Sequence, residues 1–136
     1  MANGLYGKFK ELLLGGDIDL AADDLKCVLV DTADYTVNLA TDDFLADIAA
    51  GGRVATSGNL ASKTITLGVF DAADITFSAV TGDVSEALVI YKDTGDADTS
   101  PLIAYIDTVS SGLPVTPNGG DITVTWDSGA NKIFAL

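Results

Sequence analysis

The chain has 136 residues, with 20 acidic and 7 basic side chains, no histidine and a formal net charge of −13. This length suits one domain, and acidic charge spread over most of the chain disfavours binding to duplex DNA or anionic lipid. The lack of histidine removes the commonest general base and the usual transition-metal ligand. Cys27 is the only cysteine, which excludes an internal disulfide, and its apolar neighbours predict an inert core residue.

The first predicted element is a short amphipathic helix over residues 3–14. Asn3 is a suitable N-cap, and the pair Gly15 and Gly16 is typical of a helix end. At about three turns the helix would be marginal alone. We therefore expect it either to pack on its own domain or to dock as an arm on a neighbouring subunit.

The apolar side of this helix is the candidate protein interface. Its residues follow the spacing of one helix face, with a tyrosine beside them: Leu5, Tyr6, Phe9, Leu12 and Leu13. We expect them to insert against a larger protein or a sister subunit. On this hypothesis, deletion of residues 1–14 abolishes binding and leaves the β domain folded.

The next segments are an acidic turn, a strand and a second short helix. Residues 17–24 fail as an EF-hand loop, because Ala21, Ala22 and Val28 stand where a ligand, a glycine and a glutamate are required. A strand follows over residues 25–31. Thr41 is a good N-cap for a helix over residues 42–49.

From Lys63 onward the pattern indicates one short strand after another. We expect strands over residues 64–70, 75–80, 87–92, 101–108, 121–126 and 133–136. About seven short strands with turn residues between them predict a mainly β fold, an antiparallel β-sandwich of jelly-roll type. The domain organisation we expect is an N-terminal helical arm over residues 1–16 and a single sandwich domain over residues 17–136.

The strongest strand signal lies between residues 86 and 108. Two runs, ALVIYK and PLIAYID, are apolar on both faces and flank an acidic linker. A half-exposed strand would alternate apolar and polar residues. We therefore place both runs in the middle of a sheet, paired with each other.

Candidate chemical sites are few. Asp93, Asp96 and Asp98 in the acidic linker could offer carboxylates to calcium, but nothing fixes the remaining ligands, so a solvated loop is the simpler interpretation. No spacing selects a carboxylate pair, and no nucleophile elbow, phosphate loop or metal-ligand pattern is present. The sequence predicts no catalytic residue, no cofactor or metal, and no enzyme. Trp126 and Tyr91 are expected in the core.

The order of segments resembles a group of small virion proteins of tailed bacteriophages, of the head decoration or cement type. The resemblance rests on the opening helix and on LKCVLVDTADYTVNLATDDFLADI, GVFDAADITFSAV, EALVIYKDTG, PLIAYID and GGDITVTWDSGANKIFAL. It implies a structural protein that binds the outside of a phage head in many copies and bridges major capsid subunits. The implied partners are the major capsid protein and the chain itself, as a dimer or trimer, with neither nucleic acid nor membrane.

The sequence also leads to an expected location for the protein and to rival functions. The first residues show no signal peptide, so we expect synthesis in the host cytoplasm. The resemblance implies residence on the outer capsid surface. The rival is a tail or head-fibre module that binds a receptor or glycan, and a hydrolase would need a titratable pair in a pocket. A neighbouring major capsid gene would favour decoration, and tail-fibre genes would favour the rival.

Overall fold

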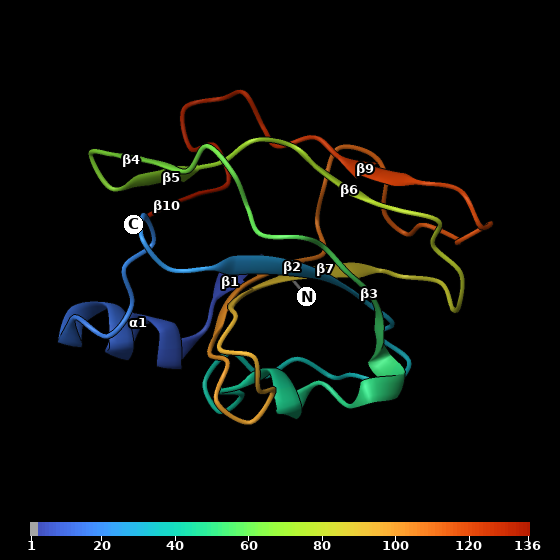
Figure 1. The fold of residues 1–136 in the computed structure, drawn as a ribbon, viewed down its shortest axis with the longest axis horizontal. Helices are drawn as coiled ribbons and strands as arrows, with labels where there is room; N and C mark the ends of the chain where they lie inside the picture. Colours follow the sequence, from blue (N-terminus) through green and yellow to red (C-terminus); the bar gives the residue numbers. More distant parts are fainter. Residues whose placement is uncertain (1–2) are drawn as a thin grey trace.

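A five-stranded sheet lies at the centre of the protein in this computed structural model, which describes residues 3–136 (Figure 1). Its order is β1 (Gly4–Leu5), β8 (Leu102–Ile106), β7 (Ala87–Lys92), β2 (Leu25–Val30) and β3 (Arg53–Thr56). Every neighbouring pair is antiparallel. The prediction that the two apolar runs pair with each other inside a sheet is confirmed.

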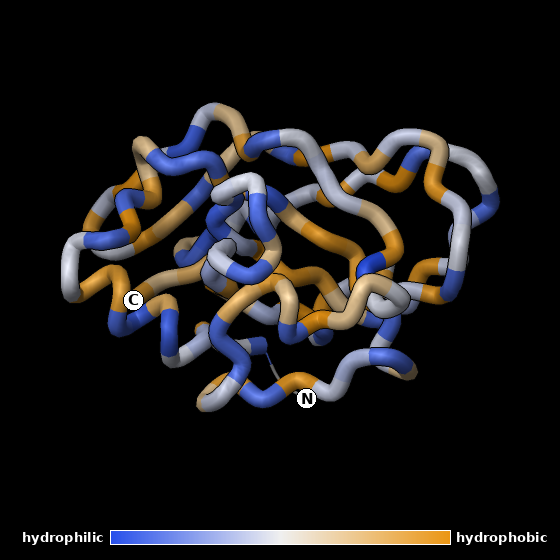
Figure 2. Tube along the Cα trace, turned by 60° about the horizontal axis from the view of Figure 1, so that its bottom comes forward, coloured by the Kyte–Doolittle hydropathy of each residue, from blue (hydrophilic) through white to orange (hydrophobic). Residues whose placement is uncertain are grey.

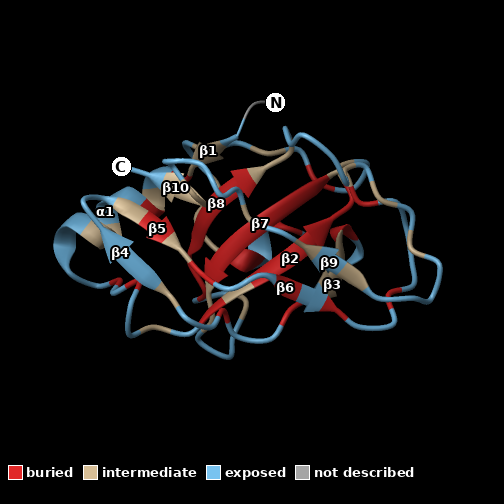
Figure 3. Cartoon of the chain, turned by 90° about the horizontal axis from the view of Figure 1, so that it is seen from above, coloured by how far each residue is buried: buried red, intermediate tan, exposed pale blue. Residues whose placement is uncertain are grey.

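The three inner strands are buried because both of their faces are covered. Val89, Ile90 and Ile103 have no exposed surface, and Cys27 is equally buried, as predicted. Figure 3 shows burial concentrated along β2, β7 and β8, and the hydrophobic segments in Figure 2 run through the interior. Each fully buried aliphatic side chain contributes roughly 1.5–3 kcal/mol, so these strands dominate the stability of the fold.

Two smaller antiparallel sheets cover one face of the central sheet (Figure 1). The first contains β10 (Phe134–Ala135), β5 (Val69–Asp71) and β4 (Thr64–Thr66), and the second contains β6 (Ile75–Phe77) and β9 (Ile122–Val124). The prediction of a mainly β, antiparallel protein is therefore confirmed.

Residues 31–52 cover the opposite face, and here the predicted helix over residues 42–49 is wrong. The structure has only two 3-10 turns, η1 (Leu45–Asp47) and η2 (Ala50–Gly52). The backbone N–H groups of Leu45 and Ala46 donate to the carbonyl oxygens of Ser100 and Ala97, at 2.8 and 3.0 Å. These tertiary hydrogen bonds replace the bonds that an α-helix would need.

The N-terminal helix is confirmed, but its start is later than predicted. Helix α1 spans Gly7–Gly15 and ends at Gly16 in the left-handed conformation, as expected. Asn3 does not cap it. Instead the Asn3 side chain accepts hydrogen bonds from the backbone N–H groups of Asp107 and Thr108 and donates to the Thr108 carbonyl, which fastens β1 beside the end of β8.

Two strand predictions also need correction. The strand expected over residues 64–70 is a hairpin, because Leu67 and Gly68 reverse the chain between β4 and β5. Strand β3 was not predicted at all. It is an edge strand with an irregular register against β2, so its alternation of side chains is weak.

Candidate functional site

The five predicted interface residues lie at different depths in the domain. Tyr6 and Phe9 are fully buried, whereas Leu5, Leu12 and Leu13 are partly buried and pack against the same core. Tyr6 and Phe9 therefore offer no surface to a partner in this conformation. Because both belong to the core, deletion of residues 1–14 would remove packing as well as surface, and point substitutions make the cleaner test.

A buried hydrogen-bond chain explains the position of Tyr6. Its hydroxyl lies 2.9 Å from that of Tyr35, which donates to Asp42 Oδ2 at 2.7 Å. The same carboxylate oxygen accepts from the Asn38 backbone N–H. Burial raises the pKa of Tyr6, and burial followed by these hydrogen bonds raises that of Tyr35. Both phenols are therefore neutral hydrogen-bonding groups that join the N-terminal segment to residues 31–52.

Phe9 joins α1 to the end of the chain. Its ring meets Phe134 edge to face, with centroids 5.8 Å apart, and Phe134 stacks on Phe70 at 5.3 Å. Such aromatic pairs stabilise a core beyond the area they bury. The helix, β10 and β5 are therefore packed as one unit.

Two carboxylates of the acidic linker are engaged by backbone N–H groups of the same turn and by a lysine. Asp93 forms an ion pair with Lys26 at 2.6 Å and accepts from the Gly95 backbone N–H, while Asp96 accepts from that of Asp98. The Lys26 ammonium, then the Gly95 N–H, lowers the pKa of Asp93. Across residues 3–136, no three Asp, Glu, His or Cys side chains are grouped closely enough to hold a metal ion.

The acidic segment before β2 is also a set of hydrogen-bonded turns. Asp19 Oδ1 accepts from the backbone N–H groups of Ala21 and Ala22, and Asp23 pairs with Lys92 at 3.0 Å. Burial works against ionisation of Asp23, but the Asp19 N–H and Lys92 outweigh it and lower its pKa. These carboxylates fix the chain locally, in agreement with the predicted turn.

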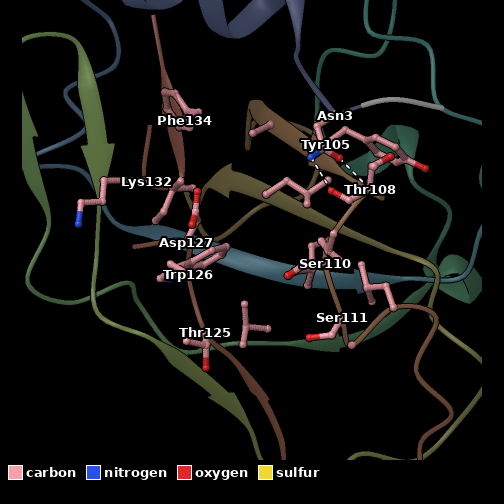
Figure 4. Close-up of a pocket in the computed structure, with 18 of the residues that line it drawn as sticks. Asn3, Tyr105, Thr108, Ser110, Ser111, Thr125, Trp126, Asp127, Lys132 and Phe134 are labelled. Carbon is pink, nitrogen blue, oxygen red and sulfur yellow. Dashed lines mark hydrogen bonds between the residues drawn. The ribbon is translucent and has the colours of Figure 1, made fainter. Parts of the chain in front are cut away.

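A cleft of about 900 Å³ opens between the central sheet and the C-terminal segment (Figure 4). Strands β2, β7 and β8 supply apolar side chains to its lining, namely Leu29, Leu88 and Ile106. The later segments supply polar side chains (Ser110, Ser111, Thr125, Asp127 and Lys132) and also apolar ones (Leu113, Ile122, Trp126 and Phe134). Trp126 is held in place because its indole N–H donates to the Ala73 carbonyl at 3.0 Å. Figure 4 shows Trp126 and Asp127 on one side and Ser110 and Ser111 on the other.

The described lining of the cleft contains three ionisable side chains, Tyr105, Asp127 and Lys132. Asp127 is the single carboxylate among its described lining residues, whereas glycoside hydrolysis generally uses two. Burial, with Asp107 close by, raises the pKa of the Tyr105 phenol to about 12, so this group stays neutral. A lining that mixes apolar and polar side chains and includes the aromatic residues Tyr105, Trp126 and Phe134 suits an amphipathic ligand.

A second surface lies at the end of the molecule where α1, the β4–β5 hairpin and the C-terminus meet (Figure 1). Its apolar residues border a depression of about 340 Å³ that also contains Asp19. We call it the apolar end surface and define it by Leu13, Ile18, Ile65 and Leu136, which line the depression, together with Leu67 in the adjoining hairpin turn. Leu67 and Leu136 are among the most exposed apolar side chains of the described chain.

Sequence reasoning missed this surface except for Leu13. One signal was available: residues 64–70, TITLGVF, form an uncharged run in a chain with 27 charged side chains, 20 acidic and 7 basic. Uncharged apolar segments on an exposed strand are typical of contact surfaces. The run was instead interpreted as one continuous strand.

Comparison with known proteins does not assign this chain to a group. No protein-family model matches the sequence, and no curated protein matches it significantly. Within residues 3–136, the helices are too short and too polar to cross a lipid bilayer.

Proposed function

We propose that this chain is a structural virion protein, a capsid decoration or cement protein that binds the outside of a phage head and stabilises contacts between major capsid subunits. The sequence resemblance to phage decoration proteins supports the proposal. So does the strongly acidic composition, which disfavours nucleic acid and anionic membranes as partners. The chain would act by burying surface and would make or break no covalent bond.

The observation that carries the proposal is the apolar end surface. An acidic protein gains solubility from its charge, yet here leucines from separate segments are exposed together at one end. Exposed apolar patches rimmed by polar residues mark protein contact sites. A contact with capsid subunits would remove this surface from water.

Stabilisation of the shell would come from many copies acting together. Each decoration subunit that touches two capsid proteins, or a sister subunit as well, converts modest contacts into lattice-wide cohesion through effective concentration. The predicted jelly-roll-like sandwich is part of this proposal, with the five-stranded sheet as one layer and the two small sheets as the other.

Cosedimentation with heads tests the proposal. The wild-type chain is mixed with undecorated heads assembled from the major capsid protein of the same phage, and bound protein is measured after pelleting. Saturable binding in a fixed ratio to capsid subunits, with a higher temperature of head disruption, is expected. Failure of the folded chain to bind these heads would overturn the proposal.

The cleft favours a second candidate, a receptor- or glycan-binding module of the tail or head fibres. Trp126 offers an aromatic surface and the neighbouring hydroxyl groups offer hydrogen bonds, a combination that suits sugars. A glycan array distinguishes the two functions. Specific binding that is lost in Trp126→Ala, together with no affinity for heads, would favour this candidate.

A further inference from the structure

The β4–β5 hairpin has a turn that its sequence does not favour. Thr66 pairs with Val69, which leaves Leu67 and Gly68 as a two-residue loop with φ values of 51° and 80°. Two-residue hairpin loops with positive φ at both positions prefer Asn-Gly, Asp-Gly or Gly-Gly. Leucine is a poor choice there, because its β-carbon crowds the backbone in the left-handed conformation.

Leu67 is also 99% exposed, so its side chain gains almost nothing from packing on its own fold. It therefore combines a strained backbone conformation with an apolar side chain in water. Strain of this kind, when it is observed, points to a functional role. Leu67 fits the turn poorly and exposes an apolar side chain to water. Both features are explained if a partner protein buries that side chain.

We propose that Leu67 is the anchor by which this chain docks on a partner protein that has an apolar socket with a basic rim. This inference rests on the proposed function, in which that partner is the capsid protein. Leu67 would enter the socket as a projecting side chain. An apolar group of the partner would fill the adjacent depression of about 340 Å³, which is lined by Leu13, Ile65, Leu136 and the aromatic rings beneath.

Charge identifies the partner as basic and as different from this chain. Asp19 lines the depression, and the exposed Asp17 lies close to it in the sequence. The nearby Lys63 is already engaged, because its ammonium group donates to the Asp23 carbonyl. A second copy of this chain also has a net charge of −13, so it would bring further carboxylates to the same place. Lysine or arginine on a different partner would instead complement Asp17 and Asp19.

The variant Leu67→Asn separates docking from folding. Asparagine removes the apolar anchor and, in a turn followed by glycine, improves the backbone fit. Val84→Asn is the matched control, because Val84 is an exposed apolar residue in the loop between β6 and β7. This loop lies at the end of the molecule opposite the β4–β5 hairpin (Figure 1). Both variants are assayed for melting temperature and for affinity to undecorated heads.

The expected result for Leu67→Asn is a raised melting temperature together with at least about tenfold weaker binding, since a central apolar anchor commonly carries that much of an interface. Val84→Asn should bind as the wild type does. Asp17→Asn should weaken binding a few-fold and reduce its dependence on salt.

Three outcomes would overturn the inference, and they are distinguishable. If the wild type binds heads and Leu67→Asn binds equally well, the anchor is wrong and the decoration function stands. If the wild type does not bind heads, the function fails and the inference fails with it. If sedimentation equilibrium shows self-association that Leu67→Asn abolishes, the occupant is a second copy and the basic partner is wrong.

Discussion

The central strands β7 and β8 and the hairpin β4–β5 differ in almost every physical respect. The central strands are buried on both faces and their side chains contact one another through matched cross-strand pairs. All three β4 residues are exposed, and the hairpin turn places a leucine in water with a left-handed backbone. The two regions therefore contribute to different properties of the protein.

This difference shows how stability and contact surface are divided along one chain. The buried strands gain free energy from apolar burial and dispersion within the domain. Strand β4 and the Leu67 turn gain little from the domain, although Phe70 in β5 belongs to the core, so substitutions in β4 and the turn should leave the fold intact and change only what they touch.

Ile90→Ala and Ile65→Ala form a matched pair that compares the two regions directly. Ile90 is fully buried in β7, and its truncation should lower the free energy of unfolding by about 2–5 kcal/mol. Ile65 in β4 is half exposed, and its truncation should cost about 0.5 kcal/mol or less. Urea denaturation measures both. Equal losses would show that the hairpin is as important to stability as the central sheet.

Tyr35→Phe tests the hydrogen-bond chain that fixes the N-terminal segment. The substitution removes the donor to Asp42 and leaves the buried Tyr6 hydroxyl without its partner, which should cost about 1–3 kcal/mol of unfolding free energy. Tyr6→Phe removes one hydrogen bond and leaves the Tyr35 to Asp42 bond in place. It should therefore destabilise the protein less, and the reverse order in thermal denaturation would contradict this arrangement.

Leu67→Asn should stabilise the protein by about 1 kcal/mol, because asparagine tolerates the left-handed conformation better than leucine does. Differential scanning calorimetry measures the gain. Leu67→Ala is the control, since alanine also lacks the apolar anchor but keeps the same backbone strain, and it should show no gain. A loss of stability in Leu67→Asn would indicate that Leu67 packs on its own domain.

Asp93→Asn should produce the smallest effect, and only above acidic pH. The Lys26 ion pair and the Gly95 N–H hold the pKa of Asp93 below its ordinary 3.8. The ionised form therefore stabilises the fold above that pH, and the contribution disappears as the pH falls through the lower folded-state pKa. At pH 7 the variant should lose less than about 1 kcal/mol, and at pH 2 it should match the wild type.

Asp98→Asn provides the charge-matched control for that titration. It makes the same change of net charge on the same linker but leaves the Lys26 pair intact. Urea midpoints are measured across the acidic range. The midpoint of Asp93→Asn should lie below that of the wild type at neutral pH and meet it as the pH falls, whereas Asp98→Asn should not show this change. Parallel curves for the two variants would mean that net charge matters and the ion pair does not.

Elements that follow from local pattern were predictable from the sequence. The apolar residues of β2, β7 and β8 predicted that these segments are strands in the interior of a sheet, and Gly16 predicted the end of α1. Elements decided by tertiary contacts were not predictable. Turn η1 exists because Leu45 and Ala46 bond to the linker near Ser100, and no local pattern contains that information.

The candidate site was predictable only in part, for a related reason. The apolar residues near the N-terminus were found, but their spacing could not show that Tyr6 would bond to Tyr35 and so lie in the core. Leu67 was missed because Leu-Gly is an uncommon hairpin turn. The cleft combines residues from strands and loops far apart in the chain, and only the fold brings Leu29 near Trp126.

We propose that this chain works by burying the exposed Leu67 side chain against a basic capsid surface. The most direct measurement is a pair of binding curves on undecorated heads, for the wild type and for Leu67→Asn, with folding of each verified in the same buffer. The account predicts saturable, salt-sensitive binding of the wild type and at least about tenfold weaker binding of the more stable variant. Identical curves would contradict it.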